Sequence, residues 1–278
     1  MPSSPKLIQK CLRNVIQPQR TRSTQRDSDG KTSFLAIFSL RPRRTLRFKV
    51  VDMHLLILGR GKTGSLVAEV AAARRHHVRV FSTAENADGR ALTPEALATT
   101  DVVIDFTNPA AAVANAEACI RAKKYLVVGT TGWYEQLPRL RELVLSSNAG
   151  FLYGSNFSIG VNLFFEIAAT AGVALKYDYS GQIFERHHEQ KKDAPSGTAL
   201  TIQEIVREAG GQELEITSFR EGDAVGMHEV TFNSASDRIY LCHDAKSRQG
   251  FAEGAVRAAE WLAGKTGFFE FRNVWREL

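Results

Sequence analysis

The sequence predicts an α/β fold, with a doubly wound parallel sheet first and a smaller α+β region with an open mixed sheet after it. Between residues 53 and 156, short apolar runs alternate with amphipathic helical stretches, a pattern typical of βα units. After residue 157, three strand-like runs follow one another without helices between them, which favours an antiparallel or mixed sheet. We therefore expect one domain from 53–156 together with 251–278, and a second from 157–250.

Buried strands alternate with helices in the first domain. The strands are expected at 55–58, 78–81, 102–106, 125–128 and 151–153, and the helices at 62–75, 109–122 and 135–147. Runs such as VVID and YLVV are apolar on both faces, as the strands of a parallel sheet covered by helices on both sides must be.

In the second domain, helices and strands alternate at first and strands then follow alone. Helices are expected at 159–175 and 198–208, and strands at 181–187, 214–219, 229–233 and 239–243. A last helix, at 252–263, returns the chain to the first domain in this scheme.

The bulk composition is that of a globular protein. The chain has 278 residues, of which 44% are hydrophobic and 24% charged, and is long enough for one large domain or two modest ones. No apolar run approaches the roughly 18 to 20 residues needed to span a bilayer, so neither a transmembrane helix nor a membrane partner is expected. Cys11, Cys119 and Cys242 form no CxxC pair and no metal-ligand spacing, which indicates a reducing, cytoplasmic location and no bound metal.

The net charge of +6 is concentrated near the N-terminus. Residues 1–52 have 12 Lys and Arg against 3 Asp and Glu, whereas the remaining 226 residues have 24 against 27. The body is mildly acidic, so the basic balance gives little support for nucleic-acid binding. We interpret 1–52 as a disordered basic extension, or as upstream sequence translated from a start codon ahead of Met53. Its Arg-rich, acid-poor composition also resembles a transit peptide.

A glycine-rich turn, GRGKTG, follows the first expected strand and opens the first helix. In G-x-G-x-x-G spacing the first glycine permits a tight turn, the second lets the backbone approach a pyrophosphate, and the third allows close helix–strand packing. The helix N-terminus offers N–H groups to phosphates. A purely structural turn is the alternative, and the spacing of a P-loop is absent. The turn predicts a Rossmann-like domain that binds NADPH or NADH through Gly59, Arg60, Gly61, Lys62, Thr63 and Gly64.

The choice between the two coenzymes depends on the end of the second strand. An NAD site usually has an acidic residue there, but the sequence reads FSTAEN, with Ser82 and Thr83 ahead of Glu85. With Arg60 and Lys62 in the turn, this favours NADPH weakly, because the cations accommodate a 2′-phosphate. The alternative is that both cations are solvated surface charges.

The segment ERHHEQKKDAPSGTA combines a proton donor with an anion site. His187 and His188 end a strand, and histidine titrates near neutral pH. Pro195 blocks an earlier helix start and Ser196 is a suitable N-cap, so the next N–H groups remain free to hold a carboxylate. Lys191 supplies a charge for a second anionic group. The pattern fits a small dicarboxylate that is protonated as it is reduced; a solvated turn with surface lysines is the alternative.

The same segment resembles the signature of the dihydrodipicolinate reductases, also named 4-hydroxy-tetrahydrodipicolinate reductases. Other motifs of that family occur in the expected order. They are Asp105, Phe106 and Thr107 with Pro109, then GTTG from Gly129, SNFSIGVN from Ser155, Gly226, His228, His243, Ser247, Arg248, Phe251, Gly254 and Ala255. The likeness covers the chain from about Met53 to the C-terminus.

This resemblance implies reduction of 4-hydroxy-tetrahydrodipicolinate to tetrahydrodipicolinate with NAD(P)H, in diaminopimelate and lysine synthesis. It implies His187 as the catalytic acid and Lys191 as a second catalytic or carboxylate-binding cation. The residues implied to bind the substrate are His188, Ser196, Gly197 and Thr198. Those implied to hold the nicotinamide end of the coenzyme are Phe106, Thr107, Gly129, Thr130, Thr131, Gly154, Ser155, Asn156 and Phe157. The resemblance also implies a homotetramer formed through the sheet of the second domain.

The sequence departs from the commoner family pattern in three places. The glycine-rich turn is one residue shorter, and the segment between the second and third strands is short, so coenzyme preference stays open. Gln190 stands where a third histidine is common. Two other hypotheses remain. Another two-domain dehydrogenase, such as an aspartate or homoserine dehydrogenase, would lack the HHxxK segment, and a non-catalytic NADP-binding sensor would bind the coenzyme without turnover.

Overall fold

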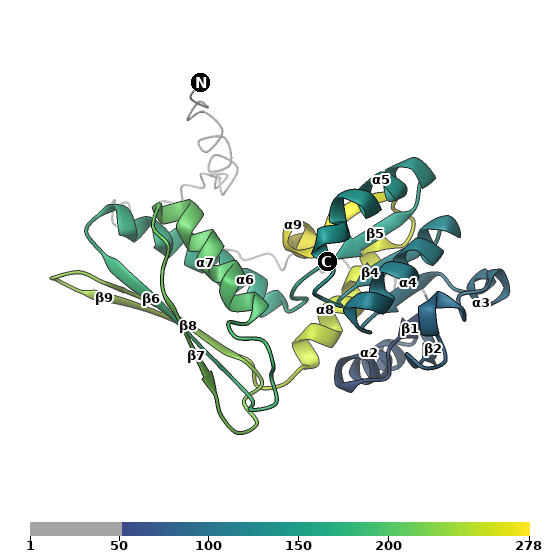
Figure 1. Cartoon of the computed structure of the whole chain (residues 1–278), viewed down its shortest axis with the longest axis horizontal. Coiled ribbons are helices and arrows are strands. Elements are labelled where there is room, and N and C mark those ends of the chain that lie inside the picture. The colour runs from purple at the N-terminus through teal and green to yellow at the C-terminus, as the bar shows by residue number, and fades with distance from the viewer. Residues whose placement is uncertain (1–51) are drawn as a thin grey trace, which may run out of the picture. The chain divides into compact units, whose positions relative to one another are not determined.

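The structure, a computed structural model, describes residues 52–278 and contains two β-sheets in that part of the chain (Figure 1). The interpretation of the basic extension falls on residues 1–51, which lie outside the described part. The predicted α/β fold with a parallel and a mixed sheet is confirmed.

The first sheet has six parallel strands in the order β10-β5-β4-β3-β1-β2. Their bounds are β1 His54–Leu58, β2 His77–Phe81, β3 Val102–Asp105, β4 Tyr125–Val128, β5 Gly150–Tyr153 and β10 Gly267–Glu270. Five of them confirm the predicted strands. The sixth, β10, was not predicted, because a four-residue run such as GFFE gives no periodicity to separate a strand from a helix end.

Helices cover both faces of this sheet (Figure 1). They are α2 Lys62–Ala73, α3 Pro94–Ala98, α4 Pro109–Arg121, α5 Leu137–Ser147, α8 Gln249–Leu262 and α9 Phe271–Val274, with short 3-10 helices at Ala87–Gly89, Tyr134–Gln136 and Trp275–Glu277. Successive residues of β1 point to opposite layers: Ile57 packs in the core with α2 and α8, and Leu58 in the core with α4 and α5. The last long helix, α8, packs against strands of the parallel sheet.

The second sheet is mixed, in the order β7-β6-β8-β9, with β6 parallel to β7 and antiparallel to β8. Its strands are β6 Ser180–His187, β7 Ile216–Arg220, β8 Met227–Asn233 and β9 Arg238–Asp244. Two helices, α6 Ile159–Gly172 and α7 Gly197–Gly210, lie side by side on one face of it, and a 3-10 turn at Val173–Lys176 extends α6 (Figure 1).

The helix-covered face of this sheet changes from apolar to polar along the strands. In strand register, one cross-strand row is Ile216, Ile183, Val230 and Leu241. The row two residues further along β6 is Ser218, Glu185, His228 and His243, all on the same face because side chains alternate. His187 and Arg220 come next, again paired in register. The hydrophobic core of this half therefore ends in a band of ionisable groups.

One helical segment of the described chain, Ile159–Lys176, is long and apolar enough to cross a membrane by length and composition. The expectation that no segment approaches this length is therefore wrong, because α6 and its 3-10 extension continue one apolar run. In the fold, Val161, Phe164 and Phe165 of this segment are buried in the core between α6, α7 and the mixed sheet. One side of the segment is thus buried, whereas Ile159, Leu163 and Ile167 on its other side are exposed.

Candidate active site

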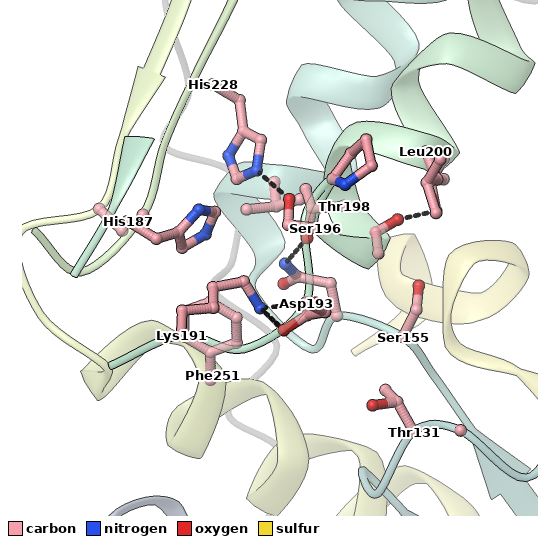
Figure 2. A pocket seen from close by; sticks show the side chains of 18 of the residues that line it. Thr131, Ser155, His187, Lys191, Asp193, Ser196, Thr198, Leu200, His228 and Phe251 are labelled. Carbon is pink, nitrogen blue, oxygen red and sulfur yellow. Dashed lines mark hydrogen bonds and ion pairs between the residues drawn. The ribbon is translucent and has the colours of Figure 1, made fainter. Parts of the chain in front are cut away.

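A cleft of about 880 Å³ is lined by loops of the parallel sheet and by the polar end of the mixed sheet (Figure 2). Nine of the residues singled out from the sequence line it: His187, His188, Lys191, Ser196, Gly197, Thr198, Thr131, Ser155 and Asn156. Residues from motifs 50 or more positions apart are thus brought to one place. His228, Arg248 and Phe251, which carried the resemblance without an assigned role, line it as well.

The N-terminus of α7 forms one wall of the cleft. Ser196 is the N-cap, and its Oγ accepts a hydrogen bond of 3.2 Å from the Ala199 N–H. Within the described chain the N–H groups of Gly197 and Thr198 donate to no other protein group, as expected for the first turn of a helix. A Cβ placed on Gly197 would meet only open space. Two free N–H donors at the positive end of a helix suit a carboxylate.

Two further side chains, Asn156 and Lys191, are held in place at the cleft. Asn156 Nδ2 donates to Thr198 Oγ1 at 3.2 Å, which ties the SNFSIGVN motif to the helix end. Lys191 Nζ lies 2.7 and 2.8 Å from the two carboxylate oxygens of Asp193 (Figure 2). Partial burial acts to raise the pKa of Asp193, but the hydrogen bond and charge of Lys191 outweigh it and hold that pKa below its usual range. Lys191 is therefore held at the cleft as an ammonium beside a carboxylate.

His187 is buried at the end of β6, with one ring nitrogen engaged and the other facing the cleft. Nδ1 is in direct contact with Glu185 Oε2. The other nitrogen, Nε2, would lie 2.9 Å from a Cβ at Gly226, so the glycine leaves room there. Burial lowers the pKa of His187, and the Lys191 and Arg220 charges lower it further, whereas Glu185 opposes them. The net effect is a pKa below the ordinary value of 6.5.

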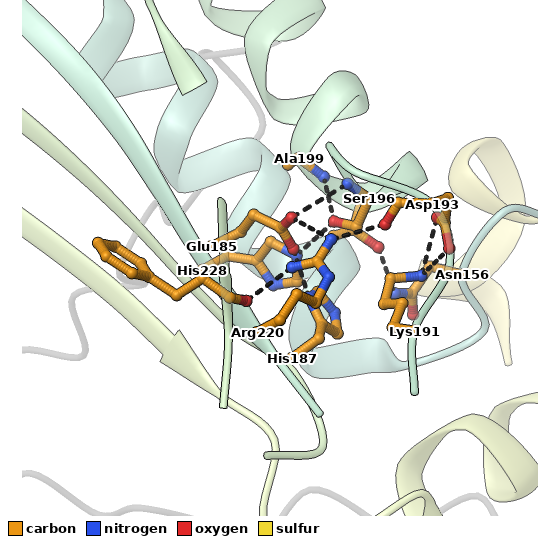
Figure 3. Close-up of polar contacts among 11 residues, drawn as sticks. Asn156, Glu185, His187, Lys191, Asp193, Ser196, Ala199, Arg220 and His228 are labelled. Carbon is orange, nitrogen blue, oxygen red and sulfur yellow. Dashed lines mark hydrogen bonds and ion pairs between the residues drawn. The ribbon is translucent and has the colours of Figure 1, made fainter. Parts of the chain in front are cut away.

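Glu185 lies at the centre of the polar band and is fully buried (Figure 3). Its Oε1 accepts hydrogen bonds from Arg220 Nη2 at 2.8 Å and from the Ser196 N–H at 3.3 Å. Burial acts to raise the pKa of this carboxyl, but hydrogen bonds from Ser218 and Arg220 and the charges of His187 and Arg220 hold it below the usual range. Glu185 is therefore held as an anion between the guanidinium of Arg220 and the ring of His187.

His228 lies beside His187, with ring centroids 5.2 Å apart in an edge-to-face arrangement. Burial and the neighbouring His187 lower its pKa to about 3, so the ring is neutral at physiological pH. Its Nε2 is 3.2 Å from Ser196 Oγ. Since that oxygen already accepts from the Ala199 N–H, its own proton is available to His228, and a chain of hydrogen bonds runs from β8 into the helix cap.

The glycine-rich turn and the loops after β3 and β4 meet at the carboxyl ends of the parallel strands. Gly59, with φ +101°, donates its N–H to Phe81 O at 2.8 Å, and a Cβ there would lie 2.2 Å from Phe106 O. A Cβ at Gly129 would lie 2.2 Å from the Phe106 ring. Only glycine permits these approaches. A Cβ at Gly61 would meet open space, so the backbone of the turn is accessible from outside.

Asp105, at the end of β3, is buried and hydrogen-bonds to the loops after β3 and β4. Its carboxylate accepts from Thr107 N at 2.9 Å and Oγ1 at 2.6 Å, Thr130 Oγ1 at 2.8 Å and Asn115 Nδ2 at 2.7 Å. Asn115 in turn accepts from Asn86 Nδ2 at 2.7 Å, which reaches the loop after β2. Burial raises the pKa of Asp105, because all its partners are neutral. Asp105 is thus the common support of three loops.

The end of β2 differs from the expectation. Glu85 folds back so that its Oε2 accepts from the Ser82 N–H at 2.6 Å, while its own N–H donates to Ser82 Oγ at 3.2 Å. A carboxylate does stand at the tip of β2, and the reasoning that none is present there was wrong, because the turn brings a residue three positions later back to the strand end. Hydrogen bonds from Ser82 and, to a smaller extent, the charge of Arg60 lower the pKa of Glu85.

The residues expected to hold the coenzyme are divided between two places. Thr131, Ser155 and Asn156 line the cleft. The others surround the carboxyl ends of β1, β3, β4 and β5: Gly59, Arg60, Gly61, Lys62, Thr63, Gly64, Phe106, Thr107, Gly129, Thr130, Gly154 and Phe157. The Phe157 ring is 2% exposed and packs against Phe106 and Phe271 in the core, so its side chain supports the loops.

Sequence reasoning gave no role to Glu185, Arg220, His228, Asp105 or Glu85. A signal existed for the first of these, since Glu185 and His187 are two residues apart on one strand and must share a face. Arg220 and His228 lie 35 and 43 positions from Glu185, and only the strand register places them beside His187 and Glu185. Asp105 is a polar residue in a fully buried strand, which itself indicates a hydrogen-bonded network.

Comparison with known proteins identifies the family. Two models match successive parts of the chain: "Dihydrodipicolinate reductase, N-terminus" over residues 53–157 and "Dihydrodipicolinate reductase, C-terminus" over residues 160–275. A 4-hydroxy-tetrahydrodipicolinate reductase of Christiangramia forsetii is 39% identical over 240 residues, 81% of this chain and 99% of that protein. One of Aquifex aeolicus is 41% identical over 213 residues, 68% of this chain and 80% of that protein.

Among solved structures, a dihydrodipicolinate reductase from Paenisporosarcina sp. TG-14 matches with a TM-score of 0.63 and 23% identity, over 81% of this chain and 100% of that one. At this identity the match supports the fold. The sequence relatives and both family models also show the family, and they exclude the hypothesis of a different two-domain dehydrogenase. The chain belongs to the dihydrodipicolinate reductase family, the 4-hydroxy-tetrahydrodipicolinate reductases, which are pyridine-nucleotide-dependent oxidoreductases.

Proposed function

We propose that the cleft at the polar end of the mixed sheet carries out the reaction of this family, the reduction of 4-hydroxy-tetrahydrodipicolinate to tetrahydrodipicolinate in the diaminopimelate and lysine pathway. One observation carries the assignment of the site. A buried histidine with a free ring nitrogen faces the same cleft as an ammonium group and a helix end with two free N–H donors. These are a proton donor and two anion sites, as a dicarboxylate substrate requires. The related Paenisporosarcina structure is described as having dipicolinate, a dicarboxylate, bound.

In this proposal each residue has a separate task. The Gly197 and Thr198 N–H groups and the Ser196 cap hold one carboxylate, and Lys191 with His188 holds the other. His187 presents its Nε2 proton toward the ring and gives it up as the ring accepts a hydride. The ring hydroxyl leaves as water before or during the reduction. The hydride then brings the electron pair of one new C–H bond, and the proton from Nε2, or from a water that it orients, forms the second.

The residues around the glycine-rich turn fit a dinucleotide. The accessible backbone at Gly61 and the close approach of Gly59 to Phe106 form a cradle that a Cβ would fill. The first turn of α2 has no acidic residue to oppose a phosphate. When bound, NAD(P)H supplies the hydride. We propose that Gly59, Arg60, Gly61, Lys62, Thr63 and Gly64 hold its phosphates, and that the loops from Phe106, Gly129 and Gly154 hold its nicotinamide end.

Charges of opposite sign near the proposed adenosine site favour different coenzymes. Arg60 and Lys62 favour the 2′-phosphate of NADPH, which is the basis of the weak preference for NADPH that we propose. Glu85 at the tip of β2 is a suitable acceptor for the ribose hydroxyl of NADH. Glu85 therefore reduces the preference for NADPH over NADH, and both coenzymes are substrates in this proposal.

Three further features complete the proposal. The dinucleotide-binding domain comprises 53–156 and 251–278, and 157–250 binds the substrate and forms the contacts between subunits. The face of the mixed sheet opposite α6 and α7 presents Phe219, 44% exposed, and Tyr240, 55% exposed, and a homotetramer that buries this face is proposed. Light scattering during gel filtration tests it. A cytoplasmic location accords with the free thiols Cys119 and Cys242.

A coupled assay tests the function directly. Aspartate semialdehyde, pyruvate and the upstream synthase generate the substrate, and the loss of NAD(P)H absorbance follows its reduction. We expect turnover that requires the synthase. Coenzyme binding without turnover would indicate a sensor instead and would contradict the proposal.

A further inference from the structure

We propose that Glu185 and Arg220 form a positioning pair that sets the tautomer and orientation of His187. Glu185 holds the ring by Nδ1 so that Nε2 faces the cleft, and Arg220 holds the Glu185 carboxylate in place. This inference rests on the proposed role of His187 as the acid. It adds two residues to the site that neither line the cleft nor touch the substrate in the arrangement described.

The two oxygens of Glu185 serve different partners. Oε2 contacts His187 Nδ1, and Oε1 accepts from Arg220 Nη2 at 2.8 Å and from the Ser196 N–H at 3.3 Å (Figure 3). A carboxylate with one oxygen held by a guanidinium and a backbone N–H cannot rotate freely. The remaining oxygen, Oε2, contacts Nδ1 without the geometry of a standard hydrogen bond. This contact favours a proton on Nδ1, since a lone pair there would repel the carboxylate. Neutral His187 therefore carries its proton on Nδ1, and a second proton can enter and leave only at Nε2.

Arg220 is itself held in place, at the end of β7. Nη1 donates to Phe219 O at 2.7 Å, and Nη2 donates to Asp193 O at 2.6 Å as well as to Glu185. Asp193 is the residue whose carboxylate holds Lys191. The guanidinium thus joins the strand that carries the histidine to the loop that carries the lysine, and one positioning pair sets the distance between both functional groups.

The free nitrogen has space reserved for it. A Cβ at Gly226 would lie 2.9 Å from Nε2, which is closer than real Cβ contacts allow, and the loop backbone at Gly226 lines the cleft. The ring is therefore held on its Nδ1 side by a charge and left open on its Nε2 side by a glycine. This asymmetry distinguishes a positioned proton donor from a histidine that only fills the core.

The charges around the ring act in opposite directions. Four ionisable groups face His187: Glu185 on β6, Arg220 at the end of β7, His228 on β8 and Lys191 in the following loop. Glu185 favours the imidazolium, whereas Lys191 and Arg220 disfavour it, and His228 is neutral at physiological pH. Removing Glu185 or Arg220 must therefore move the titration of His187 in opposite directions, which loss of packing alone would not do.

A metal ion is a weaker explanation of the same cluster. Glu185, His187 and His228 each bring a potential ligand atom within 4.8 Å of the others. However, Glu185 already accepts from the guanidinium of Arg220, and its other oxygen is in direct contact with the His187 ring. A cation between them would have to displace both contacts.

The test is the pH dependence of kcat/KM for Glu185→Gln and Arg220→Gln. An acid catalyst must be protonated, so kcat/KM falls as pH rises through the pKa of His187. We expect Glu185→Gln to move this fall to lower pH by about one unit and to lower kcat about 10- to 100-fold. We expect Arg220→Gln to move it to higher pH. Shifts in the same direction, or none, would overturn the inference.

Matched controls separate the pair from general charge changes. Arg186→Gln removes a cation from the same strand, on the opposite, exposed face, and Glu189→Gln removes an exposed carboxylate close by. Neither should move the profile. Glu185→Asp retains the charge and should restore the wild-type profile in part. If Glu185→Gln does not fold, the direction of the Arg220→Gln shift still decides.

A second measurement reports the tautomer itself. In protein with 15N-labelled histidine, we expect the neutral His187 ring to carry its proton on Nδ1 in the wild type and to lose that preference in Glu185→Gln. Adding Glu185→Gln to a His187→Gln background should cause little further loss of kcat, because the pair acts through the histidine. If His187→Gln alone leaves kcat unchanged, the proposed function fails. If it lowers kcat but the second change is fully additive, only the positioning pair fails.

Discussion

Two fully buried carboxylates, Asp105 in the parallel sheet and Glu185 in the mixed sheet, have opposite electrostatic surroundings. Asp105 accepts from the neutral groups of Thr107, Thr130 and Asn115, and burial raises its pKa. Glu185 is beside Arg220 and His187, and its pKa is held below the usual range. A buried acid therefore lies beneath the proposed coenzyme site and another beside the proposed proton donor, but only Glu185 has a charged partner.

The two carboxyl groups therefore have different tasks: Asp105 organises loops, and Glu185 sets the charge near a titratable group. A carboxylate with hydroxyl and amide donors organises loops, because it offers several acceptor sites to short side chains. A carboxylate with cationic partners also sets the charge that a neighbouring titratable group experiences. We therefore expect changes at the coenzyme end to alter binding and stability, and changes at the mixed sheet to alter turnover and its pH dependence.

The largest effect is expected for the proton donor. His187→Gln should lower kcat by about 10² to 10⁴, the range for lost acid catalysis. Coenzyme affinity, measured by fluorescence titration, should be unchanged. His77→Gln, at an exposed site on the other sheet, is the control. Wild-type turnover in His187→Gln would remove this residue from the site.

A smaller effect is expected for the ammonium group. Lys191→Ala removes a charged hydrogen-bond donor, which is worth roughly 1.5–3 kcal/mol and corresponds to a loss of about 10- to 100-fold in kcat/KM. Both KM for the dicarboxylate and kcat should change, because Lys191 holds the substrate in its reacting position. The adjacent, exposed Lys192→Ala should behave as wild type. Normal constants for Lys191→Ala would contradict the assignment.

The loop-supporting carboxylate should behave differently. Asp105→Asn replaces an acceptor by an NH2 donor among four donors, and should lower the free energy of unfolding by about 1–3 kcal/mol. It should also raise KM for the coenzyme, since the Thr107 and Thr130 loops lose their common partner. Denaturant unfolding measures the first effect. The control is Asp101→Asn, at an exposed position just before the same strand, where the carboxylate accepts one hydrogen bond, from the His54 N–H at 2.7 Å. Equal stability of both variants would contradict the role of Asp105.

The smallest effect concerns coenzyme choice. Glu85→Ala should raise the ratio of kcat/KM for NADPH to that for NADH, by about tenfold, because one charged hydrogen bond to the ribose hydroxyl is lost. Arg60→Ala should lower the ratio. If both variants keep the wild-type ratio, neither charge selects the coenzyme.

Most of the fold was predictable because its signals are local. Runs that are apolar on both faces, such as VVID, predict parallel strands. A glycine-rich turn between a strand and a helix predicts where the strand ends and the helix begins. The chemistry of residues 187–198 was also readable, since the strand end, the N-cap Ser196 and the lysine are consecutive. The exceptions are β10 and the helices α3 and α9, which are four or five residues long and too short to show a periodic pattern.

The remaining parts of the site depend on long-range pairing. Arg220 and Glu85 have ordinary neighbours in the sequence, and their roles follow only from strand register or from the way a turn folds back. From sequence alone, a charged side chain is predicted to lie on the surface unless its partner is known. The same limit applied to α6, because a single sequence does not show which of its apolar residues face the core.

The most direct test of the contrast between the two buried acids is a side-by-side comparison of pH–rate profiles for Glu185→Gln and Asp105→Asn. Both changes replace the carboxyl group of a buried acid by a carboxamide. We predict that the fall of kcat/KM at high pH moves to lower pH in Glu185→Gln and stays at its wild-type position in Asp105→Asn, whose defect is confined to coenzyme KM and stability. Equal shifts in both variants, or a shift in Asp105→Asn alone, would contradict the account.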